Sequence, residues 1–245
     1  MPLNASSVYT SDDKTKILSR VALFAELPES SLAALAEITG TRSLRPKEEL
    51  FHKGDEANEL YVVVSGHLKI TTTSSDGNDL MFGVAGPGEV CGEIALLTQW
   101  PRTATVSALE ATSLLAIGRR QLHALLHEQP EVGIALLSVV ATRVATLSRL
   151  LEDTQFLNLP IRLARKLRDF GAIHGKRRRD DPPGVVTIDL KLSQEEWGDL
   201  VGTTRESINK QFRAWSDAGL ISIRAKVVTI LDPTEISRLA DCRTE

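Results

Sequence analysis

Apolar residues in the first 40 positions recur at helical spacing. Ile17, Val21 and Phe24 are separated by four and three residues, and Pro28 interrupts the pattern before it resumes. Apolar side chains three and four positions apart lie on one face of a helix, and proline is favoured in the first turn of a helix. We therefore expect two short helices between residues 11 and 40.

After residue 40 the pattern changes to short runs of apolar and β-branched residues, separated by turns that contain glycine. The runs are Leu60–Val64, Leu68–Thr73, Leu80–Val84, Ala104–Leu109 and Ser113–Ile117. The turns are Ser65-Gly66, Asp76-Gly77-Asn78 and Gly86-Pro87-Gly88. Strands this short with turns this regular favour a small antiparallel roll or barrel.

Helical spacing returns at Arg119 and continues to Leu159, with a break at Gln129-Pro130. Within this stretch, apolar residues step alternately by three and four positions: Leu137, Val140, Val144, Leu147 and Leu151. This spacing is typical of the a/d seam of a two-stranded coiled coil. It favours a homodimer, and the alternative is a helix that packs on its own domain.

The last third of the chain opens with a further helical stretch, Ile161–Phe170, and a loop, Gly171–Gly184. The pattern then predicts a strand, two helices separated by a turn, and two short strands. The three strands are expected at Val185–Leu190, Leu220–Ile223 and Val227–Leu231. We place the domain boundary near Asn158. The chain then divides into a β-rich domain with N-terminal helices (1–129), a dimerisation helix with a hinge (130–158) and a C-terminal domain (159–245).

The composition indicates a soluble globular protein. Of the 245 residues, 42% are hydrophobic and 25% are charged, which excludes a disordered or fibrous chain. The longest uncharged stretch of the middle helix, Val132–Thr142, is shorter than the roughly 18 residues of a membrane span, and the N-terminus lacks a signal-peptide pattern. We expect a cytoplasmic protein with no membrane contact.

No pattern of residues supports metal, disulfide or catalytic chemistry. Cys91 and Cys242 lie far apart without a CxxC motif, and the five histidines show no metal-ligand spacing. Such spacings accompany zinc fingers, cysteine-ligated clusters and disulfide frameworks. The carboxylates Glu89 and Glu93 are not accompanied by a nucleophile and base. We expect free thiols, no metal and no enzymatic activity.

Charge is distributed unevenly along the chain. Residues 160–245 carry 16 lysines and arginines and 13 acidic side chains, whereas the preceding residues carry 13 and 19. The basic excess of the C-terminal part weakly favours a polyanionic partner. The run Lys176–Arg179 is followed by Asp180 and Asp181. We interpret it as a solvated loop whose charges are neutralised locally, and the alternative is a second contact with DNA.

A glycine turn between two short helices indicates a DNA-binding motif. Ser193 and Glu196 form a capping box on the first helix, Gly202 supplies the turn, and Thr203 or Thr204 caps the second helix. The first turns of the second helix would enter a major groove, where arginine, lysine and glutamate match guanine and cytosine edges. The residues expected to contact DNA are Thr204, Arg205, Glu206, Ser207, Asn209 and Lys210. The alternative is a solvated helical hairpin, but the flanking strands look like a wing and favour DNA binding.

Small residues, an acid and an arginine come together within the β-rich domain, in segments 88–97 and 101–106. A helix that begins near Gly92 offers backbone N–H groups to an anion, and Arg102 adds a planar donor suited to phosphate. A carboxylate such as Glu93 beside a phosphate needs a hydroxyl partner, for which a ribose 2′-OH is suitable. The alternative is that Glu93 and Arg102 pair with each other.

These motifs resemble those of a known family. The segments similar to a cyclic-nucleotide-binding roll are Leu50–Asp55, Leu60–Gly66, Gly92–Leu96 and Pro101–Ala104. Arg205–Ile208 resembles the recognition helix of the cAMP receptor protein branch of the Crp/Fnr transcription regulators. The resemblance covers about residues 15–235 in the same order. It implies an α+β fold with an N-terminal cyclic-nucleotide-binding β-roll, a long dimerisation helix and a C-terminal winged helix-turn-helix.

The resemblance also implies which residues bind the ligand. They are Gly92 and Glu93 at the ribose, Arg102 and Thr103 at the cyclic phosphate, and Leu147 and Ser148 at the purine across the dimer. Ile94, which follows Glu93, also belongs to the expected ligand-binding set. The family usually has threonine where Leu147 stands, and a leucine side chain cannot hydrogen-bond an adenine amino group. Ser148 is then the remaining polar contact to the base. Cyclic AMP is the first choice of ligand and cyclic GMP the second.

For DNA, the resemblance implies a ligand-gated homodimer on a palindromic operator. Arg205 and Glu206 match the family positions that read G and C in a TGTGA-like half-site. Lys210 replaces a third reader that is usually arginine, so we expect relaxed preference at that base. The loop 174–184 falls where family activators touch RNA polymerase. The alternative is a regulator of the same fold that binds DNA constitutively or responds to a different small effector.

Overall fold

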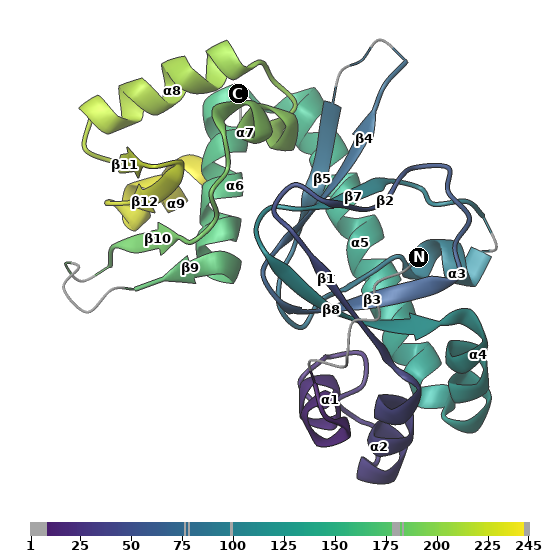
Figure 1. Cartoon of the computed structure of the whole chain (residues 1–245). Helices are drawn as coiled ribbons and strands as arrows, with labels where there is room; N and C mark the ends of the chain where they lie inside the picture. The colour runs from purple at the N-terminus through teal and green to yellow at the C-terminus, as the bar shows by residue number, and fades with distance from the viewer. Residues whose placement is uncertain are drawn as a thin grey trace. The chain divides into compact units, whose positions relative to one another are not determined.

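The computed structural model describes residues 9–75, 77, 79–98, 100–177, 182 and 184–242. The chain divides into two compact units, one of residues 1–72 with 82–145 and the other of residues 73–81 with 146–245. The division between residues 145 and 146 falls within one long helix, α5 (Pro130–Phe156), which is labelled in Figure 1. The domain boundaries expected at residues 129 and 158 flank this helix, and they stay predictions.

Two short helices precede the strands of the first unit, as the sequence predicts. They are α1 (Ser11–Leu18) and α2 (Glu29–Ile38). Thr10 and Asp13 cap α1 reciprocally, because the Thr10 side chain accepts from the Asp13 amide at 3.2 Å and the Asp13 carboxylate accepts from the Thr10 amide at 3.1 Å. Pro28 stands at the N-cap of α2.

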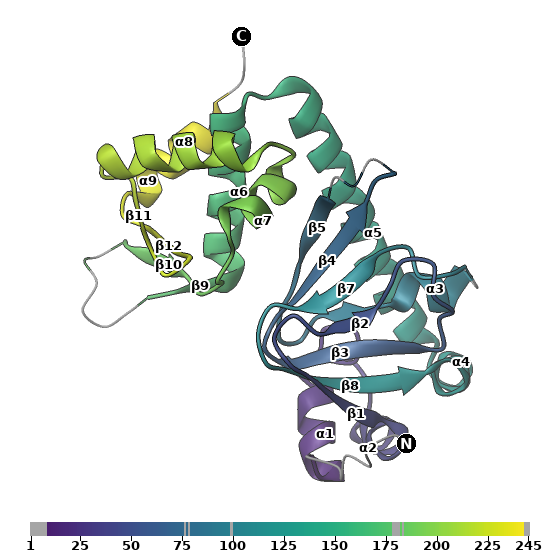
Figure 2. The ribbon, with the colours of Figure 1, turned by 45° about the horizontal axis from the view of Figure 1, so that its top comes forward.

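The strands of the first unit form a β-roll of two four-stranded sheets (Figure 2). The first sheet has the order β1 (Gly40–Leu44), β8 (Thr112–Gly118), β3 (Glu59–Ser65), β6 (Val90–Cys91). The second has the order β2 (Glu49–Phe51), β7 (Thr105–Ala108), β4 (Leu68–Thr73), β5 (Asp79–Ala85). Strand pairs such as β3 with β8 and β4 with β7 are antiparallel, which confirms the predicted antiparallel roll.

Strand β3 shows how one short segment serves two cores. Leu60 and Val62 pack with the residues of the N-terminal helices and α5, whereas Tyr61 and Val63 pack with side chains from the other sheet. Successive side chains on a strand point to opposite faces, so a strand covered on both sides is apolar at every position. This explains the unbroken apolar run from Leu60 to Val64.

Two helices of the first unit connect the sheets to α5. Helix α3 (Glu93–Thr98) follows β6, and α4 (Arg119–Glu128) follows β8. The Arg119 guanidinium ties α4 to α3, because it donates to the carbonyl oxygens of Leu96 at 3.1 Å and Ala57 at 2.7 Å. Helix α3 begins directly after Gly92, where the sequence places a short helix.

Helix α5 has an apolar seam that the described chain does not cover. Its seam residues are exposed by 69% at Leu137, 58% at Val144, 45% at Leu147 and 64% at Leu151, while Val132 and Leu136 are its buried residues. By length and composition alone the helix would also be able to cross a membrane. Arg143 within it would make such a span costly. A heptad-spaced stripe beside charged faces instead fits a second helix.

The second unit begins with α6 (Leu159–His174), which Asn158 caps by accepting from the Ile161 amide at 3.2 Å. Helix α7 (Gln194–Val201) and helix α8 (Arg205–Asp217) follow as the predicted helix pair. A small sheet has the order β11 (Ile221–Arg224), β12 (Val227–Ile230), β10 (Val186–Ile188), β9 (Gly175–Lys176). These strands agree with the predicted strands to within two residues, apart from β9, which was not predicted.

One further helix, α9 (Pro233–Asp241), was missed. Its start signal is present in the sequence, since Asp232 caps the helix by accepting from the Glu235 amide at 2.9 Å and Pro233 occupies the first turn. Ile236 and Ala240 are buried and face α6, with which α9 makes extensive contact. The helix therefore closes the core of the second unit.

Candidate ligand pocket and nucleic-acid interface

Gly92 occupies a position that glycine alone fits. Its φ is +84°, in the left-handed region, and a Cβ there would lie 2.4 Å from Nη1 of Arg102. The carbonyl oxygen of Gly92 accepts from that same Nη1 at 2.9 Å. The glycine thus allows the arginine to lie directly against the backbone before α3.

Arg102 is buried, with 5% of its surface exposed. Besides the bond to Gly92, it donates from Nη2 to the carbonyl oxygen of Glu59 at 2.7 Å, and its Nε has no hydrogen-bond partner. Burial lowers the pKa of its guanidinium. An arginine whose Nε–H is buried and unpaired is a donor that a bound anion could satisfy.

Glu93 is fully buried and has a partner that the sequence did not indicate. Its Oε1 accepts from Nη1 of Arg143, on α5, whose Nη2 also donates to the carbonyl oxygen of Val90. Glu93 Oε2 has no partner. The alternative in which Glu93 pairs with Arg102 is therefore wrong. The signal for Arg143 was its position as the first charge after the uncharged run Val132–Thr142.

The two unpaired atoms indicate what this candidate site can bind. Arg102 Nε offers an N–H to an acceptor, and Glu93 Oε2 offers an acceptor to a donor. A ligand that carries an anionic oxygen and a hydroxyl matches both. Neighbouring Cys91 takes no part in such chemistry, because burial raises the pKa of its thiol to about 12 and keeps it protonated.

The structure brings together only part of the predicted ligand set. Gly92, Glu93 and Arg102 meet in the first unit, where Ile94 is half-buried and Thr103 is exposed. Leu147 and Ser148 lie on the part of α5 that belongs to the second unit, and both are exposed.

The helix pair of the second unit has the geometry expected of a helix-turn-helix. Ser193 and Glu196 form the predicted capping box, and Gly202 ends α7 with a φ of +68°. A Cβ on Gly198 would lie 2.7 Å from the carbonyl oxygen of Thr203, so the turn passes close over α7. Trp197 and Phe212, whose ring centroids are 5.8 Å apart, pack α7 against α8.

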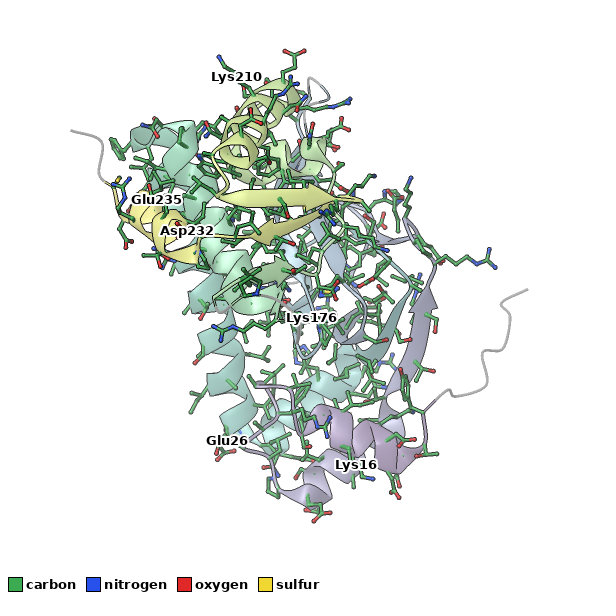
Figure 3. All side chains as sticks on the ribbon, turned by 90° about the vertical axis from the view of Figure 1, so that its left-hand side faces the viewer. Lys16, Glu26, Lys176, Lys210, Asp232 and Glu235 are labelled. Carbon is green, nitrogen blue, oxygen red and sulfur yellow. The ribbon has the colours of Figure 1, made fainter. Side chains whose placement is uncertain are left out.

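Most of the residues expected to contact DNA are exposed on α8. Thr204 is its N-cap and accepts from the Ser207 amide at 3.2 Å, so Thr204 and Ser207 also stabilise the helix start. The exposed residues of its first turns are Arg205, Glu206, Asn209 and Lys210. Figure 3 labels the Lys210 side chain, which projects from α8.

A basic hairpin lies next to α8. Ala225 and Lys226 join β11 to β12, and both have positive φ values, 50° and 68°. Two such residues in succession give a primed hairpin turn, which matches the twist of its strands. A groove of about 430 Å³ separates this hairpin from α7 and is lined by residues that include Arg205, Ile223 and Lys226. The hairpin is the predicted wing.

Two arginines of α6 tie the end of α5 to the helix-turn-helix, and the sequence did not indicate either. Arg165 donates to the Asp153 carboxylate at 2.6 Å and to the Ala240 carbonyl oxygen at 2.8 Å. Arg162 donates to the carbonyl oxygens of Thr154, at 3.3 Å, and Gly202, at 3.5 Å. The last turn of α5 is thus linked to the turn that precedes α8.

Comparison with known families gives two matches in this order along the chain. Residues 41–129 match the cyclic nucleotide-binding domain, and residues 161–239 match the Crp-like helix-turn-helix domain. The chain belongs to the Crp/Fnr family of transcription regulators. The predicted family and α+β fold are confirmed, and so is the assignment to regulators rather than enzymes.

Relatives of this Crp/Fnr regulator include cAMP-activated proteins. It is 28% identical over 230 residues to the CRP-like cAMP-activated global transcriptional regulator of Mycobacterium tuberculosis, covering 92% of this chain and 99% of the relative. It is 24% identical over 185 residues to the cAMP-activated global transcriptional regulator CRP of Salmonella typhimurium, covering 75% and 86%. The solved structure of the c-di-GMP responsive global regulator CLP of Xanthomonas campestris has the same fold, with a TM-score of 0.70, 24% identity, and coverage of 84% and 100%.

Proposed function

We propose that this Crp/Fnr regulator is a cytoplasmic homodimer whose binding to DNA is gated by a cyclic nucleotide, with cAMP as the first choice. The observation that carries the proposal is the pair of buried, unpaired atoms Arg102 Nε and Glu93 Oε2. A cyclic nucleotide carries a hydrogen-bond partner for each of them. An anionic phosphate oxygen would accept from Arg102 Nε–H, and a ribose 2′-OH would donate to Glu93 Oε2. The cAMP-activated relatives support the same choice.

In this proposal each pocket residue has a distinct role. Arg102 donates to the cyclic phosphate, and Thr103, which is exposed beside it, adds a hydroxyl donor. Glu93 accepts from the 2′-OH, and Gly92 lets Arg102 lie against the backbone next to the half-buried Ile94. Burial of the Glu93 carboxylate makes its hydrogen bond to the ligand stronger than it would be in water.

The homodimer would complete the pocket. In heptad terms Val144 and Leu151 occupy a positions and Leu147 a d position, which places Arg143 at g and Ser148 at e. In a parallel two-stranded coiled coil, a g side chain lies beside the e position of the following heptad in the other helix. Arg143 would then lie beside Ser148 of the partner subunit, at the edge of the pocket.

The base contact decides between ligands. Leu147 offers no hydrogen bond, whereas the Ser148 hydroxyl both donates and accepts and would therefore tolerate either the amino group of adenine or the oxygen of guanine. Cyclic GMP is therefore the second choice. The absence of a polar group at Leu147 also favours, as the second candidate function, a regulator of this fold that binds DNA constitutively or responds to another small effector.

Gating would act through α5. Arg143 holds this helix to the β-roll, and Asp153 and Thr154, further along it, are bound by the α6 arginines. A nucleotide that contacts both helices of the seam would favour one arrangement of the dimer, because a ligand shifts an equilibrium by its differential affinity for the two states. The bond from Arg162 to Gly202 would carry the change to the start of α8.

On DNA, two copies of α8 would enter major grooves about 34 Å apart on a palindromic operator with TGTGA-like half-sites. Arg205 and Glu206 would read G and C, and Lys210 would donate to a guanine with a relaxed preference. Contact with RNA polymerase through the loop 174–184 also stays a proposal. Arg178, Arg179, Asp180 and Asp181 of this loop lie outside the described residues.

The proposal can be tested by selecting binding sites from a pool of random DNA duplexes, with and without about 0.1 mM cAMP. This concentration is in large excess over a micromolar dissociation constant. We expect palindromic sites with TGTGA-like halves to be enriched with cAMP only. Enrichment of the same sites without nucleotide would contradict gating and favour the constitutive regulator. Enrichment of no palindrome under either condition would contradict the dimeric operator.

A further inference from the structure

The Arg102 guanidinium lies on an aromatic surface. Its central carbon is 4.0 Å from the ring centroid of Phe51, on β2, and 5.8 Å from that of Tyr61, on β3. The two rings stack on each other with centroids 6.1 Å apart and planes inclined by 27°. Aromatic residues from two strands of the β-roll thus converge on one cation.

This arrangement compensates for the burial of the arginine. Removal from water penalises the guanidinium, and it lowers the pKa of Arg102. A cation over an aromatic face is attracted by the ring quadrupole, and more strongly where water is excluded. Phe51 is 9% exposed and Tyr61 4% exposed, so both rings provide such an environment.

The rings and the backbone together fix the orientation of the guanidinium. The central carbon of the guanidinium lies over the Phe51 ring, while the carbonyl oxygens of Gly92 and Glu59 hold its two Nη atoms. The Tyr61 hydroxyl donates to the Glu59 carboxylate at 2.9 Å, which ties the second ring to the same residue. Rotation about the side-chain bonds of Arg102 would break these contacts, so Nε–H points in one direction.

We propose that Phe51 and Tyr61 are positioning residues for phosphate recognition: by fixing the plane of Arg102, they determine which of the two exocyclic oxygens of a cyclic phosphate it binds. This inference rests on the proposed cyclic-nucleotide function. The two oxygens differ only in direction. A guanidinium held in one plane distinguishes them, and one that is free to turn does not.

The test uses the two diastereomers of adenosine 3′,5′-cyclic phosphorothioate, in which sulfur replaces one exocyclic oxygen or the other. Calorimetric titration of the wild-type protein should give affinities for the two diastereomers that differ by about tenfold, the effect of one charge-assisted hydrogen bond. Phe51→Leu should weaken cAMP binding by about 3- to 30-fold and bring the two diastereomers within about twofold of each other. If Phe51 merely filled the core, its substitution would weaken the binding of both diastereomers equally and leave the ratio of the two affinities unchanged.

Phe82→Leu is the matched control, because Phe82 is an aromatic residue of β5 and is not among the rings that contact Arg102. This variant should keep the wild-type ratio of affinities for the two diastereomers. If Phe51→Leu does not fold, as judged by thermal unfolding, Phe51→Met replaces it with a side chain that adapts more readily to the cavity.

The proposal is overturned if the wild-type protein binds cAMP but does not discriminate between the diastereomers, or if Phe51→Leu keeps their ratio. If the wild-type protein binds neither cAMP nor the phosphorothioates, the proposed function itself fails, and this inference fails with it.

Discussion

The guanidinium of Arg143, on α5, binds both the fully buried carboxylate of Glu93 and the carbonyl oxygen of Val90. One side chain therefore holds the long helix to the acidic residue of the candidate pocket. A ligand that reaches Glu93 Oε2 would contact a carboxylate whose other oxygen is already bound by α5. Ligand binding and the position of this helix are for that reason expected to be coupled.

The first prediction concerns the stability of the β-roll. Arg143→Ala should lower the free energy of unfolding by about 3 kcal/mol, because it leaves the Glu93 carboxylate buried without a cation. Urea unfolding measures this change. Arg149→Ala removes an exposed arginine from the same helix and should change the free energy by less than about 0.5 kcal/mol. Equal effects of the two substitutions would show that the buried pair has no special importance.

The second prediction concerns phosphate recognition. Arg102→Ala should abolish the response to nucleotide and weaken cAMP binding by about 10- to 150-fold, the effect of losing hydrogen bonds from a charged donor. Circular dichroism should show a retained fold. Arg120→Ala, at an exposed position of α4, serves as the control. Normal cAMP affinity in Arg102→Ala would contradict the assignment of the site.

The third prediction concerns the seam of α5. Val144→Glu should raise the dissociation constant of the dimer by about 100-fold, because it buries two like charges at facing a positions. Analytical ultracentrifugation without detergent measures the change. Since Val144 is 58% exposed in the single chain, the monomer should stay folded. Ala145→Glu introduces the same charge one residue away, outside the seam, and should leave the dimer intact. An unchanged dimer in Val144→Glu would place the interface elsewhere.

The fourth prediction concerns base recognition. Arg205→Ala should weaken binding to the selected operator by about 1–3 kcal/mol and binding to random DNA by much less, as measured by fluorescence anisotropy. Arg238→Ala, on α9, removes an arginine that is bonded to Glu235 and should affect neither. Equal losses on the operator and on random DNA would show that Arg205 contacts phosphate rather than a base.

Local signals in the sequence were sufficient for much of the fold. The residues of the Ser193–Glu196 capping box and the turn at Gly202 lie within a few positions of one another, and the structure has both as predicted. The structure also has one helix over the heptad steps of α5, whose role as a dimer seam stays a prediction. Helix propensity and strand alternation act over the same short range. Gly92 and Arg102 were also identified as neighbours, because both lie on one connection of the roll.

The contacts that the sequence did not indicate join distant segments. Arg143 and Glu93 are 50 residues apart, and Arg165 and Ala240 are 75 apart. Phe51 contacts Arg102 because β2 pairs with β7, and β7 is the strand that follows Arg102 in the chain. Periodicity reveals which face of an element is buried, but the partner on that face depends on topology. These residues needed the three-dimensional arrangement to be recognised.

The central claim is that the pocket at Glu93 and Arg102 binds a cyclic nucleotide, and isothermal titration of the purified protein with cAMP and, separately, cGMP tests it most directly. The account predicts binding of one nucleotide per chain, with cAMP bound more tightly than cGMP. Absence of binding heat with both nucleotides, for a protein that still binds DNA, would contradict the claim and identify the chain as a regulator with a different effector or with none.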